Sequence, residues 1–299
     1  MLKELNLVPN KRTGPISIFI SYSTKDKNVA GEIKKGLEKL GFNCFLAHED
    51  LPAGEWREHI DTELEKFDVF LPLLTDAARE SVWVHQESGI AHKRKKKDCK
   101  NTSIIPLKVE YDPEGCLSIY QAYQLRFGFW GGLEFESKEI LALSKKFVKE
   151  IEGRDRARTY ALRKLSNAFP DEANIILDFA LWAGITLDDT KLILKTTSSN
   201  PSMAQSNGVH HKIKICYNHY EQYLRDDSVM EISWKKYDQA VRRRWEKENR
   251  QRQAQLDALA EIIKQSGKNK GKNGSSNKES EPVKNNQPQE PTKAGDNPL

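Results

Sequence analysis

The sequence lacks the patterns that mark secreted, membrane-spanning and metal-binding proteins. It has only four cysteines among 299 residues, and because no two form a CxxC pair, we expect reduced thiols rather than disulfides or a zinc site. Its seven histidines include no HExxH pattern. No run approaches the roughly 18 apolar residues that a spanning helix needs, and the N-terminus has no signal-like apolar segment. We therefore predict a cytoplasmic protein without a metal site.

Strong net charge is also missing, since the chain carries only +5 at pH 7. Two clusters of consecutive basic residues stand out, residues 93–97 and 242–244. The first cluster falls at the end of an expected helix, where the negative end of the helix dipole favours cations. Neither cluster accompanies a glycine-aromatic RNA motif or zinc-finger spacing, so nucleic-acid binding stays open as the less favoured alternative to a solvated helix face.

Glycine is absent where a phosphate cradle would require it. A nucleotide-binding loop after the first strand needs glycines so that backbone N–H groups approach the phosphate, and residues 22–26 contain none. Gly31 and Gly36 have the spacing of a P-loop, but Gly36 is followed by Leu37 rather than by lysine, and both glycines fall inside an expected helix. A phosphoacceptor receiver domain would end its first and third strands with acidic residues, where this chain has Ser21 and Thr75.

The N-terminal half alternates short β-branched or aromatic runs with helical patterns. The expected strands are residues 16–21, 43–47, 69–75, 103–109 and a short one around 123–126. Strict alternation predicts right-handed crossovers and an α/β fold with a parallel sheet covered on both faces. Within this pattern, Pro72 predicts a bulge or an edge-like position. Ser23 and Asp26 predict a capping box at the first helix.

A ligand site is expected at one edge of this sheet. Parallel sheets bind ligands at the carboxyl ends of their strands, an edge that would collect the loop after Ser21, residues 48–54, and the helix that carries Trp83 and Glu87. These last two residues are four positions apart, so they are neighbours on one helical face, where the indole can wall a pocket beside the carboxylate. Amphipathic surface helices produce the same spacing. The alternative interpretation, a tryptophan buried against the sheet and a glutamate exposed to solvent, therefore stays open.

Three segments together resemble a TIR domain: residues 18–23, 45–54 and 83–87. They occur in the order and spacing of that family, and the resemblance covers about residues 15–126. It implies a flavodoxin-like fold. It also implies cleavage of NAD between nicotinamide and ribose by a single glutamate, which by position is Glu87.

The resemblance assigns further roles around this glutamate. It implies that Trp83 lines the nicotinamide pocket, that Ser21 and Tyr22 border the pocket from the first strand, and that Trp56 stacks on the substrate. NAD would be the substrate, and no cofactor is implied. Proteins of this layout in prokaryotes commonly deplete NAD in anti-phage defence, with TIR domains associating with one another, so the resemblance implies an effector that an unidentified signal activates.

The chemistry itself needs few groups. The bond to a cationic nicotinamide requires no general acid, because the leaving group departs as a neutral base while positive charge spreads over the ribose. One carboxylate beside the anomeric carbon can stabilise that charge or attack it. Linear and cyclic ADP-ribose both remain possible products. A non-catalytic TIR scaffold in signalling is the main alternative, and nucleoside deoxyribosyl transfer on a similar sheet is a third.

The rest of the chain shows a different composition. We predict a TIR domain over residues 14–152, a small, mostly helical domain of unknown family over 153–230, an amphipathic helix over 231–265 that assists self-association, and a disordered tail over 266–299. Within the helical region, the Ser- and Asn-rich residues 196–208 are expected to form a loop.

Overall fold

The computed structural model describes residues 13–46, 56–97, 102–125 and 137–270 of the chain. Its N-terminal part is a six-stranded sheet in the order β2-β1-β3-β5-β6, with β4 also paired to β3. Every pair is parallel, so the expected flavodoxin-like α/β fold is confirmed. The strands are β1 (Ser17–Ser21), β2 (Asn43–Leu46), β3 (Val69–Leu74), β4 (Ser103–Ile104), β5 (Leu107–Lys108) and β6 (Tyr123–Gln124).

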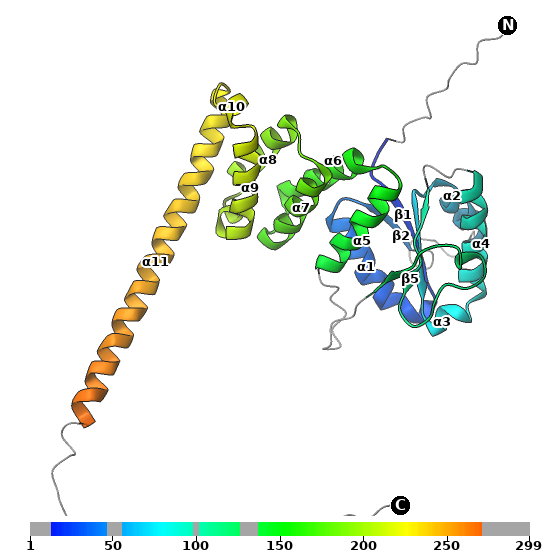
Figure 1. Cartoon of the computed structure of the whole chain (residues 1–299), viewed down its shortest axis with the longest axis horizontal. Helices are drawn as coiled ribbons and strands as arrows, with labels where there is room; N and C mark the ends of the chain where they lie inside the picture. The colour runs from blue at the N-terminus through cyan, green and yellow to red at the C-terminus, as the bar shows by residue number, and fades with distance from the viewer. Residues whose placement is uncertain (1–12, 47–55, 98–101, 126–136, 271–299) are drawn as a thin grey trace, which may run out of the picture. The chain divides into compact units, whose positions relative to one another are not determined.

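Helices cover both faces of the sheet (Figure 1). One face packs against α1 (Lys27–Lys39) and α5 (Ser137–Glu150), and the other against α2 (Trp56–Lys66) and α4 (Val82–Lys97). Alternate side chains of β1 divide between two cores, since Ile18 and Ile20 join the core that includes α1 and α5, while Phe19 joins the core that includes α2. This alternation follows from the two-residue period of a strand and requires apolar residues at successive positions.

The environment of Pro72 differs from the prediction. β3 lies inside the sheet, between β1 and the β4–β5 pair, and Pro72 is in register with Ser21. The interruption expected in β3 occurs instead in the strand segment beside it, which is divided into β4 and β5. β4 pairs with Val69 and Phe70 of β3, and β5 pairs with Leu73 and Leu74. Pro72 therefore faces the gap between β4 and β5, where its missing N–H breaks no ladder bond. The predicted edge-like position is wrong.

The start of the first helix also differs. The side chain of Ser23 makes no capping hydrogen bond, and a short 3-10 turn, η1 (Thr24–Asp26), precedes α1. The Asp26 carboxylate instead accepts a hydrogen bond of 2.5 Å from Thr75 Oγ1. Thr75 Oγ1 in turn accepts from Ala78 N and caps the short α3 (Asp76–Arg79). The predicted capping box is wrong because Asp26 bonds across the sheet edge rather than to its own helix.

The C-terminal region is mostly helical, as expected. Its elements are α6 (Arg154–Lys164), η3 (Leu165–Asn167), α7 (Pro170–Ala183), α8 (Leu187–Ser199), η4 (Pro201–Gln205), α9 (Asn207–His219), α10 (Glu221–Leu224) and α11 (Ser228–Lys270). The loop predicted over 196–208 is wrong, since most of that segment belongs to α8, η4 and α9. Its polar residues cap helices, as Ser206 does by accepting a hydrogen bond from Val209 N at 3.3 Å.

Helices after residue 153 share a core with the sheet. The chain forms two compact units, Met1–Trp245 and Glu246–Leu299. In the first unit, the ring of Phe42 contacts Phe147 of α5 and Phe179 of α7, with centroids 5.0 and 5.8 Å apart. The division at residue 153 into separate domains stays a prediction.

A close approach joins the end of α1 to α6. Gly41 has a φ of 82°, and a Cβ there would lie 2.5 Å from the carbonyl oxygen of Tyr160. Both the backbone angle and the contact therefore demand glycine. Nearby, the buried Asp68 accepts a hydrogen bond from Ser17 N at 2.9 Å and pairs with Arg156 of α6. These contacts fix α6 against the amino ends of the strands.

In the second unit, the described residues form the C-terminal part of α11. Four apolar side chains there are more than half exposed: Leu256, Leu259, Ile262 and Ile263. The predicted tail begins within the helix, and its greater part, residues 271–299, lies outside the described residues. No helix in the described part of the chain combines the length and the hydropathy needed to cross a membrane.

Candidate active site

Glu87 is a buried carboxylate at the carboxyl end of the central strands. It lies in the second turn of α4, whose start is capped by Ser81 Oγ accepting from Val84 N at 3.4 Å. Glu87 is only 2% exposed, and its Oε2 accepts a hydrogen bond of 2.5 Å from Oγ of Ser21, the last residue of β1. Its Oε1 has no hydrogen-bond partner among the described residues. A buried, half-satisfied carboxylate destabilises a fold and is typical of functional sites.

Burial changes the ionisation of this carboxyl group. Loss of solvent raises the pKa of Glu87 from 4.5 to about 7, although the hydrogen bond from Ser21 favours the charged form. The effect of desolvation on the pKa is larger than that of the hydrogen bond, because one neutral donor does not replace the water around a carboxylate. Glu87 can therefore exchange between its neutral and ionised forms near neutral pH, which suits a group that responds to charge in a ligand.

A cavity of about 490 Å³ borders Glu87. It is large enough for part of a small-molecule ligand, since such sites span about 300–1,000 Å³. One wall is Ile60 of α2, and the other is a face of α4 that includes the partly buried Trp83. The described lining residues are Ile60, Trp83, Gln86, Glu87, Gly89, Ile90 and Lys93. The cavity thus offers an aromatic wall, one titratable carboxyl group and one lysine.

Comparison with known protein families agrees with this architecture. Residues 18–161 match the family model described as TIR domain. The N-terminal part of the chain is a TIR domain. No curated protein matches the chain significantly.

The TIR domain brings together some of the predicted site residues and separates others. Ser21, Trp83 and Glu87 lie at one site, through the Ser21–Glu87 hydrogen bond and the shared cavity. Tyr22 is 1% exposed and belongs to the core that includes α1 and α5, so it is not one of the described residues lining the cavity. Trp56 is the first residue of α2, but its side chain lies outside the described residues, as do residues 48–54.

Sequence reasoning missed most of the α4 face. Gln86, Ile90 and Lys93 follow Trp83 at three-, seven- and ten-residue intervals, the spacing of one stripe on a helix. Extending the Trp83–Glu87 pair along this stripe would have found them. Within the described ranges, no group of three or more His, Cys, Asp or Glu side chains is arranged to hold a metal ion.

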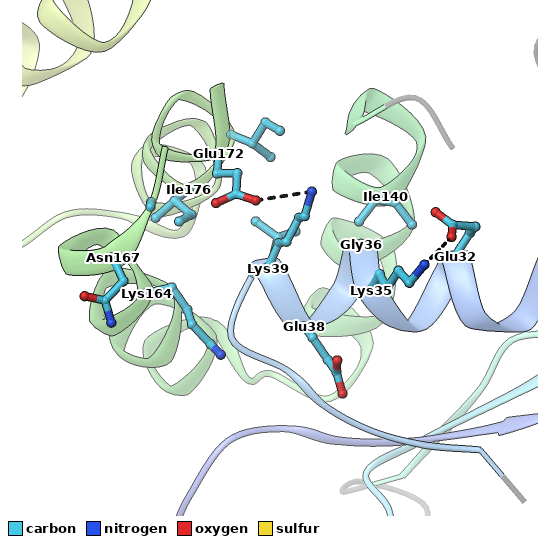
Figure 2. A pocket seen from close by; sticks show the side chains of 13 residues that line it. Glu32, Lys35, Gly36, Glu38, Lys39, Ile140, Lys164, Asn167, Glu172 and Ile176 are labelled. Atoms are coloured by element: carbon cyan, nitrogen blue, oxygen red, sulfur yellow. Dashed lines mark hydrogen bonds and ion pairs between the residues drawn. The ribbon is translucent and has the colours of Figure 1, made fainter. Parts of the chain in front are cut away.

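A larger cavity of about 600 Å³ lies against α1, α5 and the segment from α6 to α7 (Figure 2). Its charged side chains largely neutralise one another. Lys39 pairs with Glu172 at 3.2 Å, and Lys35 pairs with Glu32 at 2.6 Å, as the dashed lines in Figure 2 mark. Size alone does not define an active site, whereas the smaller cavity combines space with a buried carboxyl group of raised pKa. We therefore assign the candidate site to the smaller cavity.

Proposed function

We propose that the TIR domain cleaves NAD between nicotinamide and ribose and that Glu87 is its catalytic residue. The observation that carries this proposal is a carboxyl group 2% exposed, with one oxygen unsatisfied, at a cavity that Trp83 also lines. Such a group is costly for the fold, because burial raises its pKa to about 7. A positively charged ligand beside it would offset that cost.

The substrate itself supplies the compensating charge. Nicotinamide in NAD is a cation, and an opposite charge within a few ångströms favours the ionised carboxylate. As the bond between the anomeric carbon and the nicotinamide nitrogen breaks, its electron pair leaves with the neutral nicotinamide. Positive charge then moves onto the ribose, where ionised Glu87 stabilises it. Water adds its oxygen to the anomeric carbon and releases a proton, which yields ADP-ribose.

Trp83 would hold the departing base. An indole ring offers a flat apolar surface on which a nicotinamide ring can stack, and it keeps water away from one side of the reacting carbon. If an adenine nitrogen of the same molecule replaced water as the nucleophile, the product would be cyclic. Ser21 would act through Glu87, since its hydroxyl group donates to Oε2.

A non-catalytic scaffold is the second candidate, because TIR domains commonly self-associate. A scaffold has no use for a buried carboxyl group with a raised pKa, and this favours the enzyme. The test is nicotinamide release from NAD by the purified full-length protein. Glu87→Gln keeps the shape of the side chain and should lower the rate about 100- to 1,000-fold.

Two control variants make this test specific. Glu80→Gln removes a carboxylate from an exposed position after α3 and should retain the wild-type rate. Trp83→Phe keeps an aromatic wall and should retain more activity than Trp83→Ala. Full activity in a folded Glu87→Gln protein would exclude Glu87 as the catalytic residue, whereas a folded wild type that releases no nicotinamide would support the scaffold.

We also propose that self-association controls the enzyme, as an effector of prokaryotic defence would need. The apolar residues Leu256, Leu259 and Ile263 of α11 are each more than half exposed, and exposed apolar side chains on a helix favour association. Specific activity of the full-length protein should rise with its concentration. Leu259→Glu should weaken this rise, whereas Gln255→Glu, at an exposed polar position, should not. A rate per molecule that stays constant on dilution of the wild type would contradict control by assembly.

A further inference from the structure

Lys93 is the charged cavity residue for which the proposed chemistry has no use. It lines the same cavity as Trp83 and Glu87. It follows Glu87 by six residues, which places its backbone about 9 Å further along the axis of α4. In the described part of the chain, no carboxylate forms an ion pair with Lys93. The cavity therefore has a titratable carboxyl group in its middle and a cation towards the end opposite Trp83.

Other members of the basic run 93–97 have different surroundings. Arg94 donates to the carbonyl oxygen of Leu64 at 2.6 Å and covers the ring of Phe67. Lys95 donates to the carbonyl oxygen of Thr102. Lys96 is exposed, as Lys93 is, but it is not one of the described lining residues. The run is therefore not a uniform solvated face, and Lys93 is the member that lines the cavity.

The wall between Gln86 and Lys93 leaves room for a ligand. Gly89 occupies this part of the lining, one turn before Lys93, and a Cβ at Gly89 would meet no atom within 4 Å. A side chain in a helix covers the surface towards the preceding turn, so Lys93 can reach back over the space at Gly89. An anionic group bound there would lie between the carboxyl group of Glu87 and the ammonium group of Lys93.

We infer that Lys93 binds the diphosphate of a dinucleotide substrate. This inference rests on the proposed cleavage of NAD, in which the diphosphate is one ribose removed from the bond that breaks. A flexible lysine ammonium group is a common ligand for phosphate oxygens. Lys93 is then a substrate-binding residue that distinguishes dinucleotides from nicotinamide ribosides, which lack the diphosphate.

The test compares the full-length wild type with Lys93→Ala and with Lys96→Ala as the charge-matched control. Lys93→Ala should raise KM for NAD about fivefold, the effect of roughly 1 kcal/mol from one exposed charge pair, with little change in kcat. It should also make KM less sensitive to salt, because one screened attraction is lost. The inhibition constant of nicotinamide riboside, measured as a competitor of NAD, should stay unchanged. Lys96→Ala should behave as the wild type in all three measurements.

The outcomes separate this inference from the proposed function. If the wild type cleaves NAD and Lys93→Ala leaves KM unchanged, the role of Lys93 is wrong while the NAD-cleaving function stands. Equal losses of affinity for NAD and for nicotinamide riboside would also overturn the inference, because they would show that Lys93 acts on a part of the ligand other than the diphosphate. If the wild type fails to cleave NAD, the proposed function fails and the inference fails with it.

Discussion

Replacing Glu87 by glutamine should stabilise the protein at alkaline pH while it removes activity. Burial raises the pKa of Glu87 from 4.5 to about 7, so the folded protein binds a proton that the unfolded chain has already released. Between pH 4.5 and pH 7 the folded protein holds more protons than the unfolded chain does, so the free energy of unfolding falls as the pH rises. The loss is complete above pH 7, absent below pH 4.5, and amounts to about 3 kcal/mol.

Glutamine imitates the protonated acid. It can still accept the hydrogen bond from Ser21, and it carries no charge at any pH. The difference in the free energy of unfolding between Glu87→Gln and the wild type should therefore grow by about 3 kcal/mol from pH 4.5 to pH 8. For a unit of this size, that corresponds to a difference of about 6–12 °C in Tm.

The assay is thermal and urea denaturation of both proteins across this pH range, without ligand. Glu80→Gln is the control, since Glu80 is exposed and follows α3. Its free energy of unfolding should differ from that of the wild type by an amount that does not grow between pH 4.5 and pH 8. A pH-independent difference for Glu87→Gln would refute the reasoning, because it would mean that the carboxyl group keeps its water in the folded protein.

Activity should rise with pH over the range in which stability falls. Only the ionised carboxylate stabilises a cation, so kcat/KM for NAD should rise with pH through about 7, the pKa of Glu87 in the free protein. Bound NAD carries a positive nicotinamide that lowers the pKa of the carboxyl group, and kcat should therefore level off at lower pH than kcat/KM does. A kcat/KM that falls across this range would contradict the catalytic role of ionised Glu87.

Two further predictions test the surroundings of the site and the fold. Ser21→Ala removes the hydrogen bond that favours ionised Glu87, so the midpoint of the rise in kcat/KM should move to higher pH; an unmoved midpoint would show that this bond does not tune the carboxyl group. Gly41→Ala should lower stability to heat by about 2 kcal/mol or more, because its φ of 82° and the contact with Tyr160 exclude a Cβ. Gly31→Ala, inside α1 with nothing within 4 Å of a Cβ, should instead stabilise by about 0.5–1 kcal/mol and so provides the matched control.

Much of the TIR fold could be predicted because its signals are local. Strands and helices follow from side-chain periods of two and 3.6 residues, and their alternation in the chain implies parallel pairing. The errors arose where a polar residue had more than one possible partner. Asp26 matched a capping box by spacing, yet its carboxylate bonds to Thr75, 49 residues away in sequence. Composition predicts a loop for the Ser- and Asn-rich segment 196–208, although such residues also cap helices.

The sequence by itself determined that Trp83 and Glu87 are neighbours, because residues four positions apart on a helix share a face whatever surrounds it. It also determined the alternation of strands and helices in the N-terminal half, and this alternation implies parallel pairing. Only the tertiary structure decided that Glu87 is buried and hydrogen-bonded to Ser21, 66 residues away in sequence. It also decided that Tyr22 belongs to the core that includes α1 and α5, and that Lys93 lines the cavity. Burial, pKa and cavity shape depend on how crossover helices pack against the sheet, and that packing is the sum of many contacts between residues far apart in the chain.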